Sequence, residues 1–504
     1  MPTDDSDSPT EDRVSFDGDP DLSTLAGVRG LTRRCLDAGI AAVDPHRVVH
    51  DRLSLDGDDL VVQTGGESTT DDGATARYDL SQFDRVLVAG GGKGVGGLAR
   101  GLVDLLDGRI HEGAVVTTDV ATPADEAADS RTVGPIRVLP GDHPTPSERG
   151  VRSTEAVLEL ADAATADDLF VVLLTGGGSA LLAAPAAGLA LADLQRTTDA
   201  LLASGADIGE INAVRKHCSA IKGGRLAQRA RPATVLGLAI SDVVGDDLGT
   251  IASGPTAPDP TTFQDALDVL DRYGVDAPTA VSDLLRHGAD GAVEETPKPG
   301  DPVFGSVGNY VLANGHTALA AARETAEAAG GAGVETCLLT GRLRGEASVV
   351  GQTLAGIAEE VAATGNPVSP PAVLVAGGET TVTVTGDGVG GPNGDLALSA
   401  AIEFADWSRV GGETPVALGS VDTDGRDGSA DAAGALVDPT TVGSGGRSES
   451  RTSDDGSTIQ RARDALADDD SHGYRGGHDA LVVTGPTGTN VNDLVVLVVG
   501  DPDG

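Results

Sequence analysis

Three carboxylates follow an apolar run in the middle of the chain and could bind a metal ion. The run Thr234 to Ile240 is rich in β-branched residues and has the length of a buried strand. Asp242, Asp246 and Asp247 come directly after it. Carboxylates at the C-terminal end of such a strand point into the ligand crevice of an open α/β sheet, and Mg²⁺ takes one or two of them with water and phosphate. The alternative is a solvated acidic turn.

A glycine loop earlier in the chain could hold an anion. Gly90 to Gly97 follows a strand-like run, Arg85 to Ala89, and leads into a helical segment that ends at Leu106. Glycine lets backbone N–H groups approach phosphate or carboxylate, and Lys93 adds a compact positive charge. Gly94 follows that lysine, so the loop is not a Walker A motif, and its GxGxxG match lacks an acidic partner. The alternative is a tight strand-to-helix turn.

A second glycine loop has the same placement. Leu169 to Leu174 predicts a buried strand, and it opens into Thr175 to Leu181, which suits phosphate binding. A nucleophile elbow needs glycine two residues after its serine, but Leu181 stands there relative to Ser179, which argues against serine hydrolysis.

A basic stretch lies directly before the acidic loop. No acidic residue occurs between Glu210 and Asp242. Asn212 is a suitable N-cap for a helix, and Gly223-Gly224 interrupts the helical pattern. We expect an anion site here, with a basic stripe that pairs with acidic neighbours as the alternative. The cations in this stretch are Arg215, Lys216, Lys222, Arg225, Arg229 and Arg231.

His143 lies between Asp142 and two prolines in a rigid loop, where it could act as an acid, a base, a substrate contact or only a turn residue. Phosphate cradles, clustered cations and metal-binding carboxylates together are what phosphoryl transfer needs, because that reaction is catalysed mainly by positioning and charge neutralisation.

Composition limits the remaining possibilities. The chain has 504 residues and a formal net charge of -43, which predicts at least two domains and a halophilic surface that repels nucleic acid and anionic lipid. Three distant cysteines show no metal-ligand spacing. No apolar run reaches membrane-spanning length and no signal peptide is evident, so we expect a cytoplasmic protein.

The elements that position these loops divide the chain into two α/β domains. We expect a disordered acidic tail over 1–21, an N-terminal domain over 22–286, a linker over 287–305 and a C-terminal domain over 306–504. A low-complexity stretch over 443–456 predicts a mobile insertion. The C-terminal domain carries its own polar loops after strands, at 377–381, 422–428 and 484–493, which could line a cleft facing the first domain.

Taken together, the motifs resemble the glycerate 2-kinases that combine an N-terminal α/β domain with a C-terminal domain of the MOFRL type. The resemblance covers residues 22 to 499 and rests on GGGKGVGG (90–97), GDHPTPSERG (141–150), TGGGSALL (175–182), INAVRKHCSAIKGGRLA (211–227), ISDVVGDDLGTIASGPTAPDPTT (240–262), GGETTVTVTG (377–386), TDGRDG (423–428) and TGPTGTNVNDL (484–494).

The resemblance implies a Rossmann-like three-layer domain with a mostly parallel sheet, a smaller α/β domain, and an active site in the cleft between them. It implies Mg²⁺- and ATP-dependent phosphorylation of D-glycerate to 2-phosphoglycerate. Glycerate and ATP would be the small-molecule partners, and a homodimer is possible.

Site roles follow from the same resemblance. The catalytic set would be Lys93, Arg215, Lys222 and Asp242, and the metal ligands Asp242 and Asp246. Nucleotide and phosphate contacts would come from Gly91, Gly92, Gly176, Gly177, Gly178, Ser179, Lys216, Gly223 and Gly224. The cleft or substrate contacts would be His143, Asn212, Glu379, Asn393, Asp424, Thr487, Thr489 and Asn490.

One departure concerns the substrate. Pro392 stands where such kinases often have arginine, which weakens the expectation that this loop binds the glycerate carboxylate, although Asn393 remains. Two other functions stay open. One is a hydroxypyruvate reductase, which NADH oxidation would reveal, and the other is a non-catalytic sugar-acid sensor.

Overall fold

The structure is a computed structural model that describes residues 20–63, 75–118, 131–329, 333–409, 411–442, 455–476 and 480–501. Almost all of the expected acidic tail and of the expected insertion at 443–456 lies outside the described residues.

The first lobe is built on a seven-stranded sheet with the order β10-β9-β8-β4-β5-β7-β6. All neighbours pair in parallel except β6, which is antiparallel to β7. The strands are β4 (Arg85–Gly91), β5 (Ile110–Thr117), β6 (Arg131–Val133), β7 (Ile136–Pro140), β8 (Asp168–Leu174), β9 (Thr234–Ile240) and β10 (Val307–Ala313).

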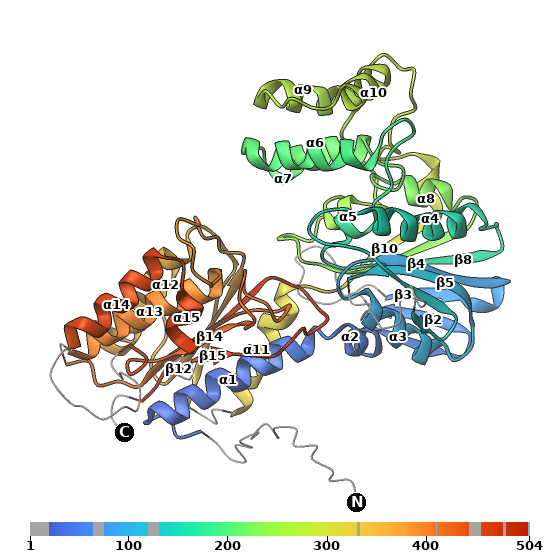
Figure 1. Ribbon diagram of the computed structural model, residues 1–504. Helices are drawn as coiled ribbons and strands as arrows, with labels where there is room; N and C mark the ends of the chain where they lie inside the picture. Colours follow the sequence, from blue (N-terminus) through green and yellow to red (C-terminus); the bar gives the residue numbers. More distant parts are fainter. Residues whose placement is uncertain are drawn as a thin grey trace, which may run out of the picture.

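Apolar helices cover both faces of this sheet, because strands buried on both sides read as continuous apolar runs. Figure 1 shows α2 and α3 on one face and α4, α5 and α8 on the other. A small antiparallel sheet, β1-β2-β3, lies on the α3 side. A separate cluster around Phe263 joins α6, α7, α9 and α10 into a layer further out.

The helices of this lobe and its small sheet are α2 (Pro45–Arg52), β1 (Leu53–Asp56), β2 (Asp59–Gln63), β3 (Thr75–Asp79), α3 (Val95–Leu106), α4 (Glu148–Asp162), α5 (Gly178–Leu181), α6 (Leu191–Ser204), α7 (Ile208–His217), α8 (Arg225–Arg229), α9 (Phe263–Tyr273) and α10 (Thr279–Ala289).

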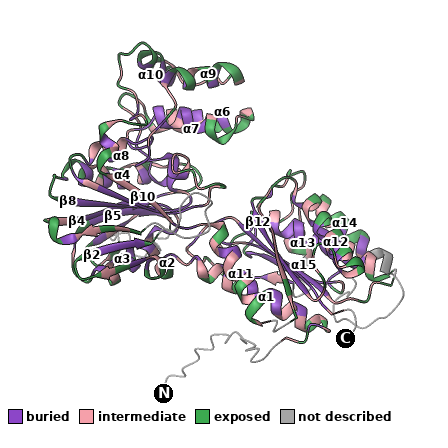
Figure 2. Ribbon diagram, turned by 180° about the vertical axis from the view of Figure 1, so that it is seen from behind, coloured by how far each residue is buried: buried purple, intermediate pink, exposed green. Residues whose placement is uncertain are grey.

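The second lobe contains a six-stranded mixed sheet with the order β11-β12-β16-β13-β14-β15. Figure 2 shows that the strands of both sheets are largely buried. The elements are α1 (Leu25–Ala42), α11 (Gly315–Ala329), β11 (Glu335–Leu343), α12 (Ala347–Thr364), β12 (Ala372–Gly378), α13 (Pro392–Arg409), β13 (Val416–Asp422), β14 (Gly434–Val437), α14 (Asp455–Ala467), α15 (Ser471–Gly476), β15 (Leu481–Val482) and β16 (Asp493–Val499).

The lobes do not divide at the expected linker. Helix α1 packs with α11 against β13 and β16 of the second sheet, because its apolar stripe around Leu31 and Leu36 belongs to that core. Strand β10, by contrast, pairs with β9 in the first sheet. The segment 287–305 also packs on the first lobe, where Glu295 hydrogen-bonds His217. The chain therefore crosses between the lobes after α1 and again after β10.

Local capping fixes several helix starts. The Ser147 hydroxyl accepts a hydrogen bond from Gly150 N at 3.1 Å, and Thr262 with Asp265 forms a capping box at α9. Helix α7 begins with a capping box of Asp207 and Glu210, so the expectation that Asn212 is an N-cap is wrong. Among the described residues, no helix is both long and apolar enough to cross a membrane.

Candidate active site

Strand register gathers the predicted loops at one edge of the first sheet. Gly91 of β4 pairs with Leu174 of β8, and Leu174 in turn pairs with Ala239 of β9. The C-terminal ends of these strands are therefore level. The chain runs outward from β4 to β5 and β7 and then returns to β8 on the other side. Strand order therefore reverses between β4 and β8, and ligands of open α/β sheets bind beside such a switch point. Both glycine loops follow these two strands.

The first glycine loop is a structural joint and not an anion cradle. Gly91 lies in the strand ladder, and Gly92 N donates to Val116 O at 3.0 Å. Lys93 N donates to Gly176 O at 2.8 Å, and Gly94 N donates to the hydroxyl of Thr175 at 2.9 Å. Because these amides are occupied, this geometry gives no support to the expected phosphate contact of Gly91 and Gly92. What the loop presents to the cleft is the Lys93 side chain.

The second glycine loop does offer donors. Within the described residues, the backbone N–H groups of Gly176 and Gly177 have no hydrogen-bond acceptor. Gly177 has φ +79°, a left-handed conformation that glycine adopts without strain. A Cβ on Gly176 would lie 2.6 Å from Oδ2 of Asp242. The loop therefore brings unpaired amides next to a carboxylate, and Gly178 and Ser179 continue it into α5.

Lys93 connects the two lobes. Its Nζ lies 2.9 Å from Oδ2 of Asp424, which belongs to the loop after β13. His143 is close by, because a Cβ on Gly177 would lie 3.0 Å from His143 Cδ2 and 3.2 Å from Lys93 Cγ. Loss of hydration around the imidazole, and then the charge of the Lys93 ammonium, lower the pKa of His143 to about 4, although part of the residue stays solvent-exposed. A neutral imidazole suits a substrate contact better than a general acid.

Lys222 supports the second glycine loop through hydrogen bonds to backbone carbonyl groups. It is 6% exposed, and its Nζ donates to the carbonyl oxygens of Ser179 at 2.5 Å and Leu182 at 3.3 Å. Burial, and then the charge of Arg215, lower its pKa to about 7. Arg215 makes no ion pair with any described residue, and burial lowers its pKa too. Two cations without a carboxylate next to them leave a surplus of positive charge behind Ser179.

Two other basic residues of this stretch, Lys216 and Arg229, pair with carboxylates. Helix α7 ends at His217 and α8 starts at Arg225, so the cations do not share one helix. Lys216 Nζ lies 3.3 Å from Oδ1 of the buried Asp259, an ion pair that gives no support to its expected nucleotide contact. Gly223 N and Gly224 N donate to Ser253 O and Gly254 O, so these glycines are not a phosphate cradle either.

A buried hydroxyl chain links α7 to the same loop. Asn212 is 4% exposed inside α7, and its Oδ1 accepts a hydrogen bond from Ser253 Oγ at 3.0 Å. Ser253 Oγ in turn lies 2.8 Å from Ser179 Oγ. Ala252 and Ser253 have φ of +50° and +60°, a strained conformation for residues with side chains. Asn212 therefore positions Ser179 and does not line the cleft surface.

Asp242 faces the second glycine loop from the end of β9. Its backbone carbonyl accepts a hydrogen bond from Asn492 Nδ2 at 2.7 Å, which ties it to the second lobe. Burial is the main cause that raises its pKa to about 6, and the charge of Glu379 adds to it. The carboxylate is therefore ionised at neutral pH and is a stronger proton acceptor than an ordinary aspartate.

The second lobe adds a row of carboxylates that its sheet register aligns. Asp493 at the start of β16 pairs with Gly378 of β12 on one side and with Asp422 of β13 on the other. Glu379 follows Gly378 directly. Burial raises the pKa of Asp493 to about 7, and burial together with Asp424 raises the pKa of Asp422. These carboxylates lie near one another, and nearby positive charge does not fully neutralise them.

Asn393 holds Asp493 and is not a cleft residue. It is 1% exposed, and its Nδ2 donates to Asp493 Oδ1 at 2.6 Å. Thr380 N donates to the other oxygen at 3.0 Å. The Asn393 backbone N–H is fixed by Asp427 at 2.9 Å. This geometry therefore gives no support to the expected substrate contact of Asn393, whose side chain orients the Asp493 carboxylate.

The loop before β16 closes the site. The Asn490 Cβ would lie 3.3 Å from a Cβ on Gly176, so this side chain reaches the first lobe. Thr487 Oγ1 donates to Thr423 O at 2.6 Å, and its N–H donates to Asp424 O at 3.2 Å. Thr489 is 2% exposed, and its Oγ1 has no partner among the described residues. Thr487 thus supports the loop of Asp424.

Two cavities flank this junction. One of about 340 Å³ is lined by Asp242, Asp246, Asn314, Arg342 and Asp493, among others. Asp246 Oδ2 accepts a hydrogen bond from Asn314 Nδ2 at 2.6 Å. The other, of about 580 Å³, has Lys93, Arg100, Thr117, Thr487 and His46 in its wall.

The carboxylates fit a hard divalent cation. Raised pKa values at Asp242, Asp422 and Asp493 mean that their negative charges are poorly neutralised, which a bound Mg²⁺ would correct. Their oxygens do not converge on one point, since no trio of them among the described residues lies within 4.8 Å. Mg²⁺ needs only one or two protein carboxylates when phosphate supplies the rest.

The site residues predicted from the sequence did not include Asn314, and Asp422, Asn492 and Asp493 were covered only as members of the loops 422–428 and 484–493 that were expected to line the cleft. Asp493 is the first residue of a strand, whereas the predicted metal ligands Asp242 and Asp246 follow a strand. Only an antiparallel strand brings its N-terminal end to the edge where its neighbours end, and nothing in the sequence gives that direction. Asp422 carried a signal, because it opens the acidic loop at 422–428 that was expected to line the cleft.

Comparison with known proteins agrees with this two-lobed arrangement. A family model described as a domain of unknown function, DUF4147, matches residues 31–286, and the MOFRL family model matches residues 372–493. The chain is 37% identical to the glycerate 2-kinase of Pyrococcus horikoshii over 94% of its own length and 97% of that relative. The chain belongs to the glycerate 2-kinase family.

A solved structure of this family has the same fold. The crystal structure of glycerate kinase from Thermotoga maritima superposes with a TM-score of 0.74 at 35% sequence identity, covering 94% of this chain and all of that one. A relative from Agrobacterium vitis, 41% identical over 82% of this chain, is named provisionally as a hydroxypyruvate reductase. Relatives of this chain are thus named either as glycerate kinases or as hydroxypyruvate reductases.

Proposed function

We propose that this protein is a glycerate 2-kinase, which transfers the γ-phosphoryl group of ATP to the 2-hydroxyl of D-glycerate. The observation that carries the proposal is the junction at the switch point, where unpaired amides, Lys93 and the carboxylates of both lobes meet. Phosphoryl transfer requires donors for phosphate oxygens, positive charge and carboxylates for a metal ion in one place. Membership of the glycerate 2-kinase family supports the same reaction.

Each described group has a part in this proposal. The N–H groups of Gly176 and Gly177 would donate to phosphate oxygens, and Arg215 behind them would stabilise the negative charge. Lys93 would contact the transferring phosphoryl group once nucleotide competes with Asp424 for its ammonium. Lys222 holds the loop in place through the Ser179 carbonyl.

Asp242 is the best placed group to accept the hydroxyl proton. As the new O–P bond forms at the glycerate 2-hydroxyl, its proton passes to the carboxylate, and the bond between the β- and γ-phosphates breaks to release ADP. Asp246 would serve as a Mg²⁺ ligand, with Asp493 lining the same cavity, so that Asp242 keeps its carboxylate for the proton. When bound, Mg²⁺ neutralises phosphate charge.

Release of ADP tests the proposal. Purified protein in molar KCl with Mg²⁺ and ATP should release ADP when D-glycerate is added. Release with another hydroxy acid instead would keep the reaction and change the substrate. NADH oxidation with hydroxypyruvate would favour the reductase, and glycerate binding without ADP release or any need for Mg²⁺ would favour a sugar-acid sensor. Either of the last two results would overturn the kinase.

A further inference from the structure

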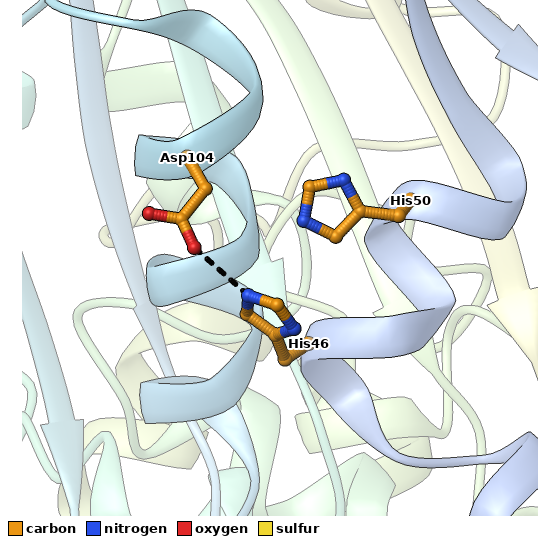
Figure 3. Close-up of side chains that lie close together, drawn as sticks. All are labelled: His46, His50 and Asp104. Atoms are coloured by element: carbon orange, nitrogen blue, oxygen red, sulfur yellow. Dashed lines mark hydrogen bonds and ion pairs between the residues drawn. The ribbon is translucent and has the colours of Figure 1, made fainter.

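A second group of metal-ligating side chains lies outside the catalytic junction. His46 and His50 are one turn apart on α2, and Asp104 is on the neighbouring helix α3 (Figure 3). His46 Nε2 lies 2.9 Å from Asp104 Oδ2, and one ligand atom from each of the three residues falls within 4.8 Å of the others. Among the described residues this is the one trio of His, Cys, Asp and Glu with that geometry.

Close helix packing fixes the backbones that carry these ligands. Helix α3 presents Gly97 and Gly101 to α2, where a Cβ on Gly97 would lie 2.9 Å from Pro45 and a Cβ on Gly101 would lie 2.8 Å from Val49. Val49 is 1% exposed, so the buried face of α2 cannot rotate away from α3. The histidines and Asp104 stand at the edge of this tight contact.

The chemistry of the ligands selects the cation. Two imidazoles and one carboxylate suit Zn²⁺ and similar borderline ions, whereas Mg²⁺ prefers oxygen ligands. Zn²⁺ binds nitrogen and oxygen at about 2.0 to 2.2 Å, so tetrahedral ligands lie roughly 3.3 Å apart. The distance of 2.9 Å between His46 Nε2 and Asp104 Oδ2 is close to this spacing. The His50 side chain is exposed and can rotate toward these two atoms.

We propose that His46, His50 and Asp104 bind one Zn²⁺-like transition-metal ion that fastens α2 to α3. The position gives the site a structural consequence. Helix α1 packs on the second lobe and α2 on the first, with only Val43 and Asp44 between them. Helix α3 begins directly after the loop of Lys93. A metal ion here would brace the point where the chain crosses between lobes, next to the cavity that His46 shares with Lys93.

Metal titration tests this site independently of catalysis. Protein stripped with EDTA and then kept in excess Mg²⁺, which occupies oxygen sites, is titrated with Zn²⁺ by calorimetry. Co²⁺ serves as a parallel spectroscopic probe of imidazole ligation. The wild type should bind one Zn²⁺, and His50→Asn and Asp104→Asn should each weaken binding at least about tenfold. His287→Asn is the matched control, since His287 is an exposed helical histidine without a second one a turn away.

Zn²⁺ binding by the four proteins decides whether the site exists. Loss of binding in His50→Asn and Asp104→Asn with retention in His287→Asn supports the site, as does a thermal midpoint that rises with Zn²⁺ in the wild type and control alone. Failure of the wild type to bind Zn²⁺ beside Mg²⁺, or equal binding in all four proteins, would overturn it. Neither result bears on ADP release, so the proposed kinase activity stands or falls separately.

Discussion

At the scale of single residues, the site is defined by which polar groups have partners. Amides of Gly92 and Lys93 are occupied, whereas those of Gly176 and Gly177 have no acceptor among the described residues, although the first loop is the richer in glycine. Lys216 is neutralised by Asp259, whereas Arg215 has no ion-pair partner among the described residues. Charge and hydrogen-bond balance therefore separate residues that bind ligand from residues that hold the fold.

Replacing Lys93 by alanine tests its contact with the transferring group. Loss of one stabilising charge in a site of this kind lowers turnover by roughly 100-fold. Lys298→Ala is the matched control, because both side chains are 27% exposed and each pairs with a carboxylate. Steady-state turnover should fall in Lys93→Ala alone, with unchanged circular dichroism in both. Equal turnover in the two variants would remove Lys93 from the mechanism.

Asp422→Asn should make the fold less sensitive to alkaline pH. Because burial and Asp424 raise the pKa of Asp422, the folded chain binds that proton more tightly than the unfolded chain does. The resulting stability is complete below the ordinary carboxyl pKa and is lost as pH rises through the raised one. Asparagine does not titrate, and its carbonyl can still accept from Asp424 N, as the carboxylate does at 2.9 Å.

The advantage of Asp422→Asn over the wild type should therefore grow by on the order of 2 kcal/mol between pH 5 and pH 9. Thermal or chemical unfolding at both pH values measures it. Asp431→Asn, whose side chain is 89% exposed, should show no such growth. A constant difference between Asp422→Asn and the wild type would mean that the carboxylate is not buried as described.

At the scale of elements, strand order decides where the site forms. The reversal between β4 and β8 places two strand-to-helix loops side by side, and antiparallel β16 brings Asp493 level with the ends of β12 and β13. Both arrangements depend on pairing between strands far apart in the chain.

Gly177→Ala should disturb the site beyond the cost of its backbone conformation. A Cβ there would approach His143 and Lys93, whereas one on Gly188, at φ +87°, would have no neighbour within 4 Å. Both changes should cost about 1 kcal/mol of unfolding free energy, because alanine resists positive φ. Only Gly177→Ala should lower kcat/KM for ATP, by at least about tenfold. Similar kinetics for the two variants would contradict a phosphate-binding role.

Much of the fold, and part of the site, could be predicted from the sequence. Apolar runs gave the strands, glycine loops marked their C-terminal ends, and Lys93, Asp424, His143 and Asp242 do come together. In the basic stretch, Arg215 and Lys222 lie near the second glycine loop as expected, but only the fold shows that Asp259 neutralises Lys216 and that the Gly223 and Gly224 amides are occupied. Strand β10 was assigned to the wrong lobe because a strand's sequence does not name its partner.

At the scale of the whole molecule, two features dominate: a net charge of -43 and a site shared between lobes. Polar contacts help to join the lobes, such as Lys93 with Asp424 and Asn492 with Asp242. Repulsion between carboxylates opposes every such contact and is weakened by salt, because the screening length falls from about 10 Å at 0.1 M to about 3 Å at 1 M.

Salt should therefore stabilise the protein strongly. We expect the midpoint of thermal unfolding to rise by at least about 10 °C between 0.1 M and 2 M KCl, which is equivalent to roughly 3 to 5 kcal/mol for a domain of this size. Differential scanning calorimetry measures it, with an uncharged osmolyte as the control for solvent exclusion. A midpoint that KCl leaves unchanged would show that surface repulsion does not limit stability.

Phosphorus NMR of the product formed from Mg²⁺-ATP and D-glycerate in molar KCl tests both the phosphoryl transfer and its position. We expect 2-phosphoglycerate to appear together with ADP, and both to be absent when Asp242→Asn replaces the wild type. A 3-phosphoglycerate signal would contradict the assigned position of transfer. No phosphorylated product with D-glycerate, from protein shown to be folded, would contradict the account as a whole.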